Sequence, residues 1–402
     1  MEINKLIEKY LPEIEKEFIS YLSTFDNNLF EVYLVGGSLR DAILKISPNE
    51  IDIAIKGNFD LFTEKLDENP NIKVAQKTEF GTAKVIYKNK EIDIANTRTE
   101  AYLPKGSLPK INELSVEIEK DLHRRDFTIN SMAYNLNNSK NNQVIDPNNG
   151  LSDLKNKLIR SIHNDSFSDD PTRIFRAIKY STRLNFNIEE QTLKELKSSS
   201  KLIKNLTSSR ILNEIKKSLD EPSPNDLINN LIKFNLFNYV FNVKNINVNF
   251  NKVPNEISNY DYLILYFTYI KEEGLSEYLN KFDNSKALKL KVEQIKNIRS
   301  AINYISNSEY DSFPEDIYLS IKNIPIAIFE VYKTFGEYQE VITNMIKKLS
   351  NAKPQLNFND MKNLGFTNPV QIGKLLLKVE IAKFKGQINT RLDEENFIRS
   401  TN

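Results

Sequence analysis

The stretch Leu34-Val35-Gly36-Gly37-Ser38-Leu39-Arg40-Asp41 has the pattern of a strand that runs into a glycine pair and then into a helix. Glycines at such a turn let backbone N–H groups approach a phosphate, and the helix N-terminus adds positive potential. Arg40 lies one turn further on, where it can clamp the same anion. Taken alone, a tight turn without a ligand explains the glycine pair more simply. The stretch therefore predicts a strand–turn–helix unit in which Gly36, Gly37 and Arg40 are candidate phosphate contacts.

The segments around this turn predict a mixed α/β unit that extends to about residue 146. Runs rich in Val, Ile and Tyr predict strands at 31–35, 51–55, 83–87 and 91–95. Helical periodicity is expected in the first 28 residues and at 38–44 and 59–66, and a loop is expected at 97–110. From residue 171 onward strand patterns almost vanish, and helices are expected at 174–184, 188–196, 209–219 and then through about residue 350. An α/β unit followed by helices is the predicted order.

A group of carboxylates follows the glycine turn. Glu50 and Asp52 are two residues apart in a predicted strand, so they share one face. Asp93 occupies a similar alternating run and can reach the same place from a neighbouring strand. Carboxylates that close repel one another unless a cation lies between them, and Mg²⁺ prefers carboxylate and phosphate oxygens. The pattern suggests metal-assisted phosphoryl or nucleotidyl transfer; solvent-facing acids on half-exposed strands are the alternative.

The run 121–130 (DLHRRDFTIN) places paired arginines beside an acid and before an apolar segment. Arg125, Asp126 and Asn130 are candidates for contacts with a triphosphate and with sugar hydroxyls. A salt-bridge cluster on the surface is the competing explanation.

The segment 169–179 (DDPTRIFRAIK) repeats cationic residues at three-residue steps: Arg173, Arg176 and Lys179, with Asp170 three residues before them. Residues spaced three apart in a helix lie near one face. A carboxylate accepts hydrogen bonds and a guanidinium donates them, which matches the edges of cytosine and adenine and leaves guanine and uracil unpaired. Asp170 and Arg173 thus suit base selection without a nucleic-acid template, although ion pairs at this spacing are common.

Composition excludes several classes of protein. The 402 residues include no cysteine and two histidines, which excludes disulfide scaffolds, Cys-ligated metals, thiol nucleophiles and His-rich metal sites. The longest apolar stretch, 262–270, is shorter than the roughly 20 residues of a membrane span. The N-terminal residues lack the apolar core of a signal peptide, so a cytoplasmic location is expected. Residues 121–220 carry 17 Lys and Arg against 12 Asp and Glu, and residues 341–402 carry 10 against 5, two basic regions that fit contact with nucleic acid or ordinary solvated helices.

In their order along the chain, six segments resemble the class II tRNA nucleotidyltransferases, the family of the CCA-adding enzymes and related bacterial poly(A) polymerases. They are GGSLRD, EID, RRDFTINSMAYN, DPNNGLSDL, DDPTRIFRAIKYSTRLNF and SRILNEIKKSL. The resemblance covers about residues 32–220 and continues weakly near the C-terminus. It implies a polymerase-β-type α/β head followed by an all-α neck, body and tail, here expected at 1–145, 146–222, 223–350 and 351–402.

The resemblance also implies roles for individual residues. Glu50 and Asp52 fall at the metal-binding catalytic positions, and Asp93 is a further catalytic candidate. Nucleotide contacts are expected at Gly36, Gly37, Arg40, Arg125, Asp126, Asn130, Asp170, Arg173, Arg176 and Lys179. Arg210 and Glu214 fit a motif that supports the preceding helix. The family usually has Asp where Glu50 stands, Arg in place of Lys179 and, in many members, Glu in place of Asp169.

The implied activity is addition of C and/or A from CTP and ATP to the 3′ end of tRNA with Mg²⁺ as cofactor. An A-adding enzyme, a CC-adding enzyme, a poly(A) polymerase and a non-catalytic RNA-binding scaffold remain open. The tail is expected to contact tRNA. No membrane and no protein partner is inferred.

Overall fold

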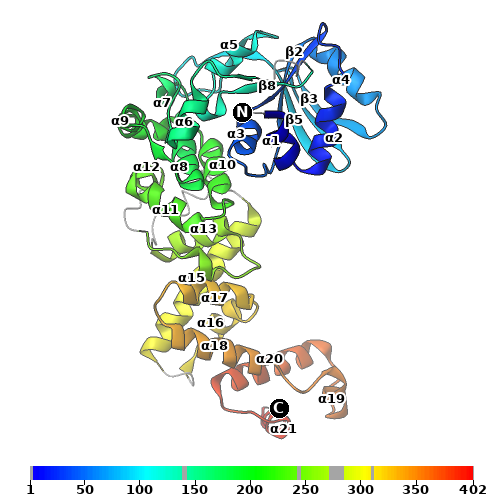
Figure 1. Ribbon diagram of the computed structural model, residues 1–402. Helices are drawn as coiled ribbons and strands as arrows, with labels where there is room; N and C mark the ends of the chain where they lie inside the picture. Colours follow the sequence, from blue (N-terminus) through cyan, green and yellow to red (C-terminus); the bar gives the residue numbers. More distant parts are fainter. Residues whose placement is uncertain (1–2, 138–142, 242–245, 271–284, 309–311, 402) are drawn as a thin grey trace. The chain divides into compact units, whose positions relative to one another are not determined.

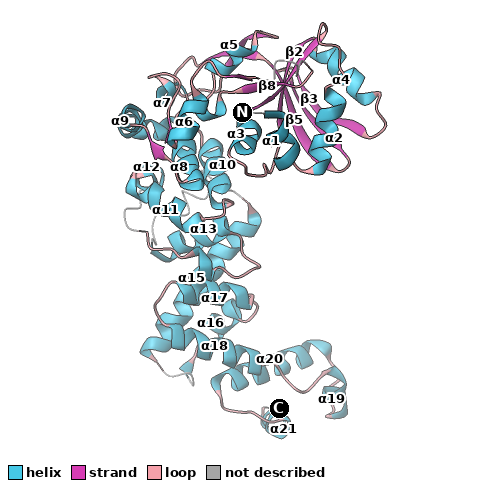
Figure 2. Ribbon diagram, in the orientation of Figure 1, coloured by secondary structure: helices cyan, strands magenta, loops and turns pink. Residues whose placement is uncertain are grey.

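The computed structural model describes residues 3–137, 143–241, 246–270, 285–308 and 312–401 (Figure 1). The chain divides into two compact units, Met1–Lys244 and Asn245–Asn402. The first unit contains the sheets and the second is built from helices, as Figure 2 shows. The predicted class, an α/β part followed by helices, is confirmed.

A mixed seven-stranded sheet with the order β3-β4-β5-β2-β1-β8-β9 forms the centre of the first unit. Strands β2 and β5 run parallel, and the other pairs are antiparallel. The strands are β1 (Phe30–Val35), β2 (Asp52–Gly57), β3 (Ile72–Thr78), β4 (Thr82–Tyr87), β5 (Lys90–Asn96), β8 (Ala133–Asn135) and β9 (Val144–Ile145).

Helices cover the two faces of this sheet through alternate residues of its strands. On one face, Phe62 of helix α4 (Phe59–Asp67) packs on Phe30, and Phe18 of helix α2 (Glu13–Leu22) packs on Tyr87. On the other face, helix α5 (Ile118–His123) buries Ile118 and Leu122 in a cluster. That cluster also contains Tyr33, Val35, Ala54 and Ala133. Because strand residues alternate between faces, this second face is also the one that presents Asp52.

Two smaller strand pairs lie beside the main sheet. Strands β6 (Arg98–Ala101) and β7 (Lys110–Leu114) form an antiparallel hairpin. The sequence predicts only a loop over 97–110, and that expectation is wrong at both ends of the segment. Strands β10 (Leu158–Ile159) and β11 (Asn187–Ile188) form a short parallel pair. Ile188, expected at the start of a helix, is therefore the last residue of a strand.

The remaining helices of the first unit precede the sheet, connect its strands or follow it. They are α1 (Ile3–Tyr10), α3 (Gly36–Ile43), α6 (Gly150–Asn156), α7 (Ser166–Asp169), α8 (Thr172–Leu184), α9 (Glu190–Ser199), α10 (Ser208–Leu219), α11 (Pro224–Lys233) and α12 (Leu236–Phe241), with the 3-10 helices η1 (Thr128–Asn130) and η3 (Ser200–Asn205). Asn58 caps α4 by accepting a hydrogen bond from the Leu61 N–H, which fixes where that helix starts.

The second unit is helical throughout its described residues. Its elements are η4 (Phe250–Lys252), α13 (Asn259–Ile270), α15 (Lys286–Asn307), α16 (Glu315–Ile321), α17 (Ile326–Thr334), α18 (Gln339–Asn351), α19 (Phe358–Asn363), α20 (Pro369–Lys385) and α21 (Arg391–Ser400). Met361, Val379 and Ile398 lie in one buried cluster that joins the last three helices. Among the described residues, no helix is long and apolar enough to cross a membrane.

Candidate active site

All thirteen candidate catalytic and nucleotide-binding residues line one cleft of about 1250 Å³ in the first unit. They are Gly36, Gly37, Arg40, Glu50, Asp52, Asp93, Arg125, Asp126, Asn130, Asp170, Arg173, Arg176 and Lys179. The residues come from the sheet, from helices α3 and α8, from η1 and from the connections before β2, η1 and α8. Segments up to 143 positions apart in the chain therefore contribute to a single site.

The glycine turn fits closely against the first carboxylate. Gly36 has φ +65°, and a Cβ on it would lie 2.9 Å from Asp52 Oδ2. The hydroxyl of Ser38 donates to the Val35 carbonyl at 2.7 Å, and the Asp52 N–H donates to that hydroxyl at 3.3 Å. These bonds tie the start of α3 to the start of β2. The turn thus holds Asp52 in place, and only glycine fits at position 36 without strain.

The three carboxylates come together from two parallel strands and a turn. Asp52 and Asp93 are direct partners in the register of β2 and β5. Glu50 lines the same cleft from the turn before β2, because pairing with β1 begins only at Asp52, opposite Val35. The expectation that Glu50 and Asp52 alternate along one strand is therefore wrong, although both reach the cleft.

The electrostatics of the carboxylates suit a cation. Burial raises the pKa of the Asp52 carboxyl above its ordinary value; Arg125 opposes this shift, and the negative charges of Asp93 and Glu50 add to it. Among the described residues, no group of three or more His, Asp or Glu side chains is already arranged to hold a metal ion. Burial and the neighbouring negative charges destabilise the ionised form of Asp52. A divalent cation bound there would neutralise the negative charge, so the carboxylates suit a metal ion.

Arg40 is buried in a network and does not project freely. Its side chain donates to Asp41 Oδ1 through Nε at 2.8 Å and to Asn130 Oδ1 through Nη1 at 2.6 Å. Arg183 of helix α8 donates to the other oxygen of Asp41 at 2.8 Å. Arg40 therefore connects α3, η1 and α8, which adds a structural role to the predicted phosphate contact.

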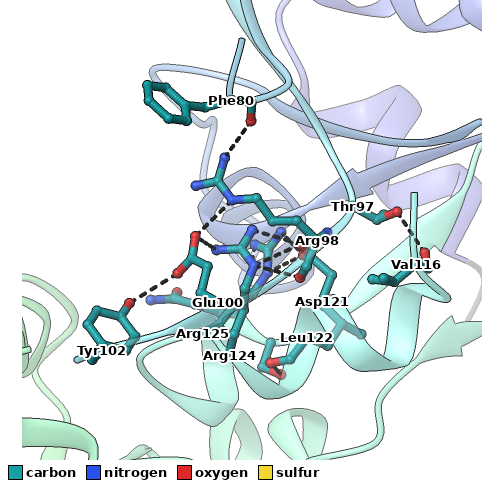
Figure 3. A network of polar contacts seen from close by, with 12 residues as sticks. Phe80, Thr97, Arg98, Glu100, Tyr102, Val116, Asp121, Leu122, Arg124 and Arg125 are labelled. Atoms are coloured by element: carbon teal, nitrogen blue, oxygen red, sulfur yellow. Dashed lines mark hydrogen bonds and ion pairs between the residues drawn. The ribbon is translucent and has the colours of Figure 1, made fainter. Parts of the chain in front are cut away.

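A second network surrounds Asp121 and holds the paired arginines (Figure 3). Arg124 donates twice to Asp121 Oδ1, at 2.9 and 2.7 Å, and Arg125 donates twice to Oδ2, at 3.3 and 3.1 Å. Burial favours the neutral form of the Asp121 carboxyl. The positive charges of Arg125 and Arg124 outweigh this effect and hold the pKa of Asp121 below its ordinary value. Glu100 binds Arg124 at 3.0 Å and Arg98 at 2.7 Å. The network fixes the direction of both arginines before any ligand binds.

Asp126 lies between Asn130 and helix α8. It accepts a hydrogen bond from Asn130 Nδ2 at 3.2 Å and pairs with Arg176 at 2.7 Å. Burial raises the pKa of Asp126, but Arg176 and Arg173 outweigh it, so the pKa is lowered overall. The Nε of Arg176 is buried and has no hydrogen-bond partner within the described part of the chain, which leaves a donor for a ligand.

The ring of Tyr180 gathers three cations of the cleft. The charged ends of Arg40, Arg176 and Lys179 lie 5.1, 5.9 and 5.5 Å from its centroid. Such contacts stabilise closely spaced positive charges.

Asp170 and Arg173 both line the cleft but bind different protein partners. Asp170 Oδ1 accepts from Arg210 at 2.6 Å and from the Thr172 hydroxyl at 2.7 Å. Arg173 donates to the Ser166 hydroxyl at 2.7 Å and to the Arg124 carbonyl at 2.9 Å. Both side chains are thus held in place by protein partners.

Several residues of the site carry no signal in the sequence that marks them. Tyr102 accepts from Arg173 Nη2 at 3.4 Å and donates to Glu100 at 3.1 Å, yet it lies in the segment predicted as a loop. Asp41 and Asp121 stand inside the quoted motifs, but the motifs alone do not mark them as site residues. Asp41 binds Arg183, which is distant in sequence, whereas Asp121 binds the nearby Arg124 and Arg125 as well as the distant Arg98 N–H.

Two family models match the chain. Residues 32–160 match the poly A polymerase head domain, and residues 185–246 match the probable RNA and SrmB-binding site of polymerase A. The first match contains the glycine turn, the carboxylates and the paired arginines.

Proteins with similar sequences carry two kinds of name. An A-adding tRNA nucleotidyltransferase of Geobacter sulfurreducens is 27% identical over 98% of this chain, and the chain spans 48% of that relative, about half its length. An A-adding tRNA nucleotidyltransferase of Halalkalibacterium halodurans is 26% identical over 92% of this chain and 88% of the relative. A CCA-adding enzyme of Streptococcus agalactiae is 26% identical over 97% of this chain and 96% of the relative.

Solved structures give the same result. A CCA-adding enzyme in an apo form matches 100% of this chain and 99% of its own length, with TM-score 0.80 and 26% identity. The Thermotoga maritima CCA-adding enzyme complexed with tRNA matches 100% of this chain and 98% of its own length, with TM-score 0.76 and 25% identity.

Proposed function

Because this chain belongs to the class II tRNA nucleotidyltransferase family, we propose that it adds C and/or A from CTP and ATP to the 3′ end of tRNA. The observation that carries the proposal is the single cleft that gathers carboxylates, arginines and the glycine turn. Its relatives are named A-adding and CCA-adding enzymes, and one similar structure is a complex with tRNA.

In the proposed reaction, the 3′-hydroxyl oxygen of the tRNA forms a bond to the α-phosphorus of the nucleotide. The bond from that phosphorus to the pyrophosphate oxygen breaks, pyrophosphate leaves, and the hydroxyl proton passes to solvent. Arg125, fixed by Asp121, and Arg176, with its unused Nε–H, orient the triphosphate and balance its charge.

The family uses divalent metal ions, and Mg²⁺ is the proposed cofactor here. Glu50, Asp52 and Asp93 are the residues that would hold it. When bound, Mg²⁺ would supply positive charge for the reacting phosphate and make the hydroxyl a better nucleophile. The fit rests on the raised pKa of Asp52, since burial and its acidic neighbours disfavour the free carboxylate.

Base selection is assigned to Asp170 and Arg173. Asp170 Oδ1 is occupied by Arg210 and Thr172, so the base would meet the other carboxylate oxygen. Arg176 and Lys179 would line the same nucleotide from the next turns of α8. An acceptor beside a donor favours C and A over G and U.

The predicted division into head (1–145), neck (146–222), body (223–350) and tail (351–402) belongs to the same proposal. The tail is assigned to tRNA binding because residues 341–402 carry more Lys and Arg than Asp and Glu. A cytoplasmic location follows from tRNA as the substrate.

Incubation of three tRNA transcripts with each labelled nucleotide tests the proposal. The transcripts end at the discriminator base, after the first C and after CC. Ordered C, C, A addition that stops indicates a CCA-adding enzyme. Addition of A to the CC end alone indicates an A-adding enzyme, addition of C alone indicates a CC-adding enzyme, and long A tracts indicate a poly(A) polymerase. Absence of incorporation on all three would contradict the proposal and favour a scaffold.

A further inference from the structure

One wall of the cleft is formed by strands β3 and β4 and has no role in the site described so far. Gln76, Thr78, Thr82 and Lys84 line the cleft, and we call them the β3–β4 wall. Gln76 pairs with Lys84 and Thr78 pairs with Thr82 in the strand register. Since paired residues and alternate residues share one face of a sheet, the four side chains belong to the same face.

The register also places this wall relative to the carboxylates. Lys84 of β4 is the direct partner of Asp93 of β5, and Asp93 is the direct partner of Asp52 of β2. Asp52 pairs in turn with Val35 of β1, beside which Gly36 stands near Arg125. The two aspartates therefore lie between Lys84 on one side and Arg125 on the other.

This order defines two sides of the reaction. Displacement at phosphorus is in line, so the attacking hydroxyl and the leaving pyrophosphate lie on opposite sides of the α-phosphate. The arginines suit the pyrophosphate, because a fixed guanidinium binds phosphate oxygens in pairs. With the α-phosphate at Asp52 and Asp93, the hydroxyl has to approach from the side of β4.

We propose that the β3–β4 wall binds the 3′-terminal nucleotides of the tRNA, with Lys84 on a backbone phosphate. This inference rests on the proposed function. The Lys84 side chain is 49% exposed, and it pairs with Glu91, 68% exposed, at 3.1 Å. An exposed pair of this kind is weak, so a phosphate displaces Glu91 at little cost. The threonines and Gln76 offer neutral donors for ribose and phosphate oxygens.

Charge complementarity favours the 3′ end of the tRNA over other ligands at the β3–β4 wall. A phosphodiester placed beside Asp93 and Glu50 meets repulsion unless a cation accompanies it, and Lys84 provides that cation on the cleft side of β4. Removal of Lys84 therefore weakens binding of the tRNA end and leaves the nucleotide site intact.

The test compares Lys84→Ala with a matched control, Lys73→Ala. Lys73 is exposed and pairs with Ile86 on the same face of the sheet, but it does not line the cleft. Binding of a fluorescent acceptor-stem RNA that ends in CC is measured in EDTA by anisotropy over a range of salt. We expect about 10-fold weaker binding for Lys84→Ala and a salt slope smaller by about 0.7, the value for one phosphate contact on a single strand.

Further variants complete the design. Lys84→Arg is expected to restore binding, and Glu91→Gln to strengthen it because Lys84 loses its competing partner. The rise in melting temperature caused by Mg²⁺ with CTP should be the same for Lys84→Ala and the wild type. Unchanged RNA binding in Lys84→Ala, or an equal loss in Lys73→Ala, would overturn the inference. If the wild type is active, either of these RNA-binding results contradicts only the role proposed for the β3–β4 wall. A wild type that adds no nucleotide contradicts the proposed function itself.

Discussion

The backbone of Gly36 lies directly against the carboxylate of Asp52. A Cβ at this position would stand 2.9 Å from Asp52 Oδ2 and 3.1 Å from a guanidinium nitrogen of Arg125. The glycine turn thus sets the space between the carboxylate and the arginine, as well as the direction of the chain. This contact explains why a short motif organises a site whose other residues come from distant segments.

Gly36→Ala should therefore impair activity more than folding. We expect a loss of about 1–2 kcal/mol in the free energy of unfolding, because alanine disfavours φ +65°. The displaced carboxylate should lower kcat at least about 100-fold. Gly336→Ala is the control, since Gly336 also has a positive φ, +103°, but a Cβ there would meet nothing within 4 Å and the residue does not line the cleft. Equal activity of the two variants, measured by nucleotide incorporation, would contradict this account.

Asp41→Ala should destabilise the first unit strongly. Arg40 and Asp41 are 2% and 3% exposed, so the change leaves a buried guanidinium without its carboxylate. Such a loss costs about 3–5 kcal/mol. Arg183→Ala removes the partner on the other oxygen, but its side chain is 26% exposed and the cost should be about 1 kcal/mol. Urea unfolding of both variants checks the order; a milder effect for Asp41→Ala would show that Arg40 finds another partner.

The free energy of unfolding should fall at acidic pH, because Asp121 becomes protonated. Its pKa lies below the ordinary 3.8 in the folded protein, so its contribution is present above pH 3.8 and is lost as the pH falls through the lower, folded value. Protonation removes the charge that holds Arg124 and Arg125. Asp121→Asn should be less stable than the wild type at neutral pH, and the difference should narrow below pH 3.8. A constant difference in urea midpoints across this range would exclude the assignment.

The sequence predicts the carboxylate site well and its supporting residues poorly. Two runs of alternating apolar residues predict that Asp93 reaches the site of Asp52 from a neighbouring strand, and the structure pairs the two residues directly. Strands β6 and β7 lack such alternation. Ion pairs with Arg98 and Arg124 bind Glu100 of β6, and the pair with Arg124 depends on tertiary structure. The prediction that Glu50 lies on a strand is wrong for a similar reason. β2 begins at Asp52, opposite Val35 at the end of β1, so Glu50 precedes the strand.

Glu394→Ala should weaken tRNA binding through the stability of the second unit. Glu394 is fully buried, binds Lys383 at 2.6 Å and accepts from the Leu356 N–H at 3.0 Å. Breaking a buried pair costs about 3–5 kcal/mol, and helices α19 to α21 should lose protection in hydrogen exchange. Glu395→Ala is the control, because it removes an acid of the same helix whose pair with the 50% exposed Arg391 is loose, at 3.6 Å. Full tRNA affinity in a Glu394→Ala protein with unprotected helices would contradict the role assigned to the tail.

Incorporation by the wild type and by Asp52→Asn tests the central claim most directly. Each protein is incubated with Mg²⁺, with labelled CTP on a tRNA that ends at the discriminator base, and with labelled ATP on a tRNA that ends in CC. We expect addition of C, A or both by the wild type. In Asp52→Asn the rate should fall at least about 1000-fold with a melting temperature close to that of the wild type, because the change removes charge and keeps shape. Incorporation by Asp52→Asn at the wild-type rate would contradict the carboxylate mechanism.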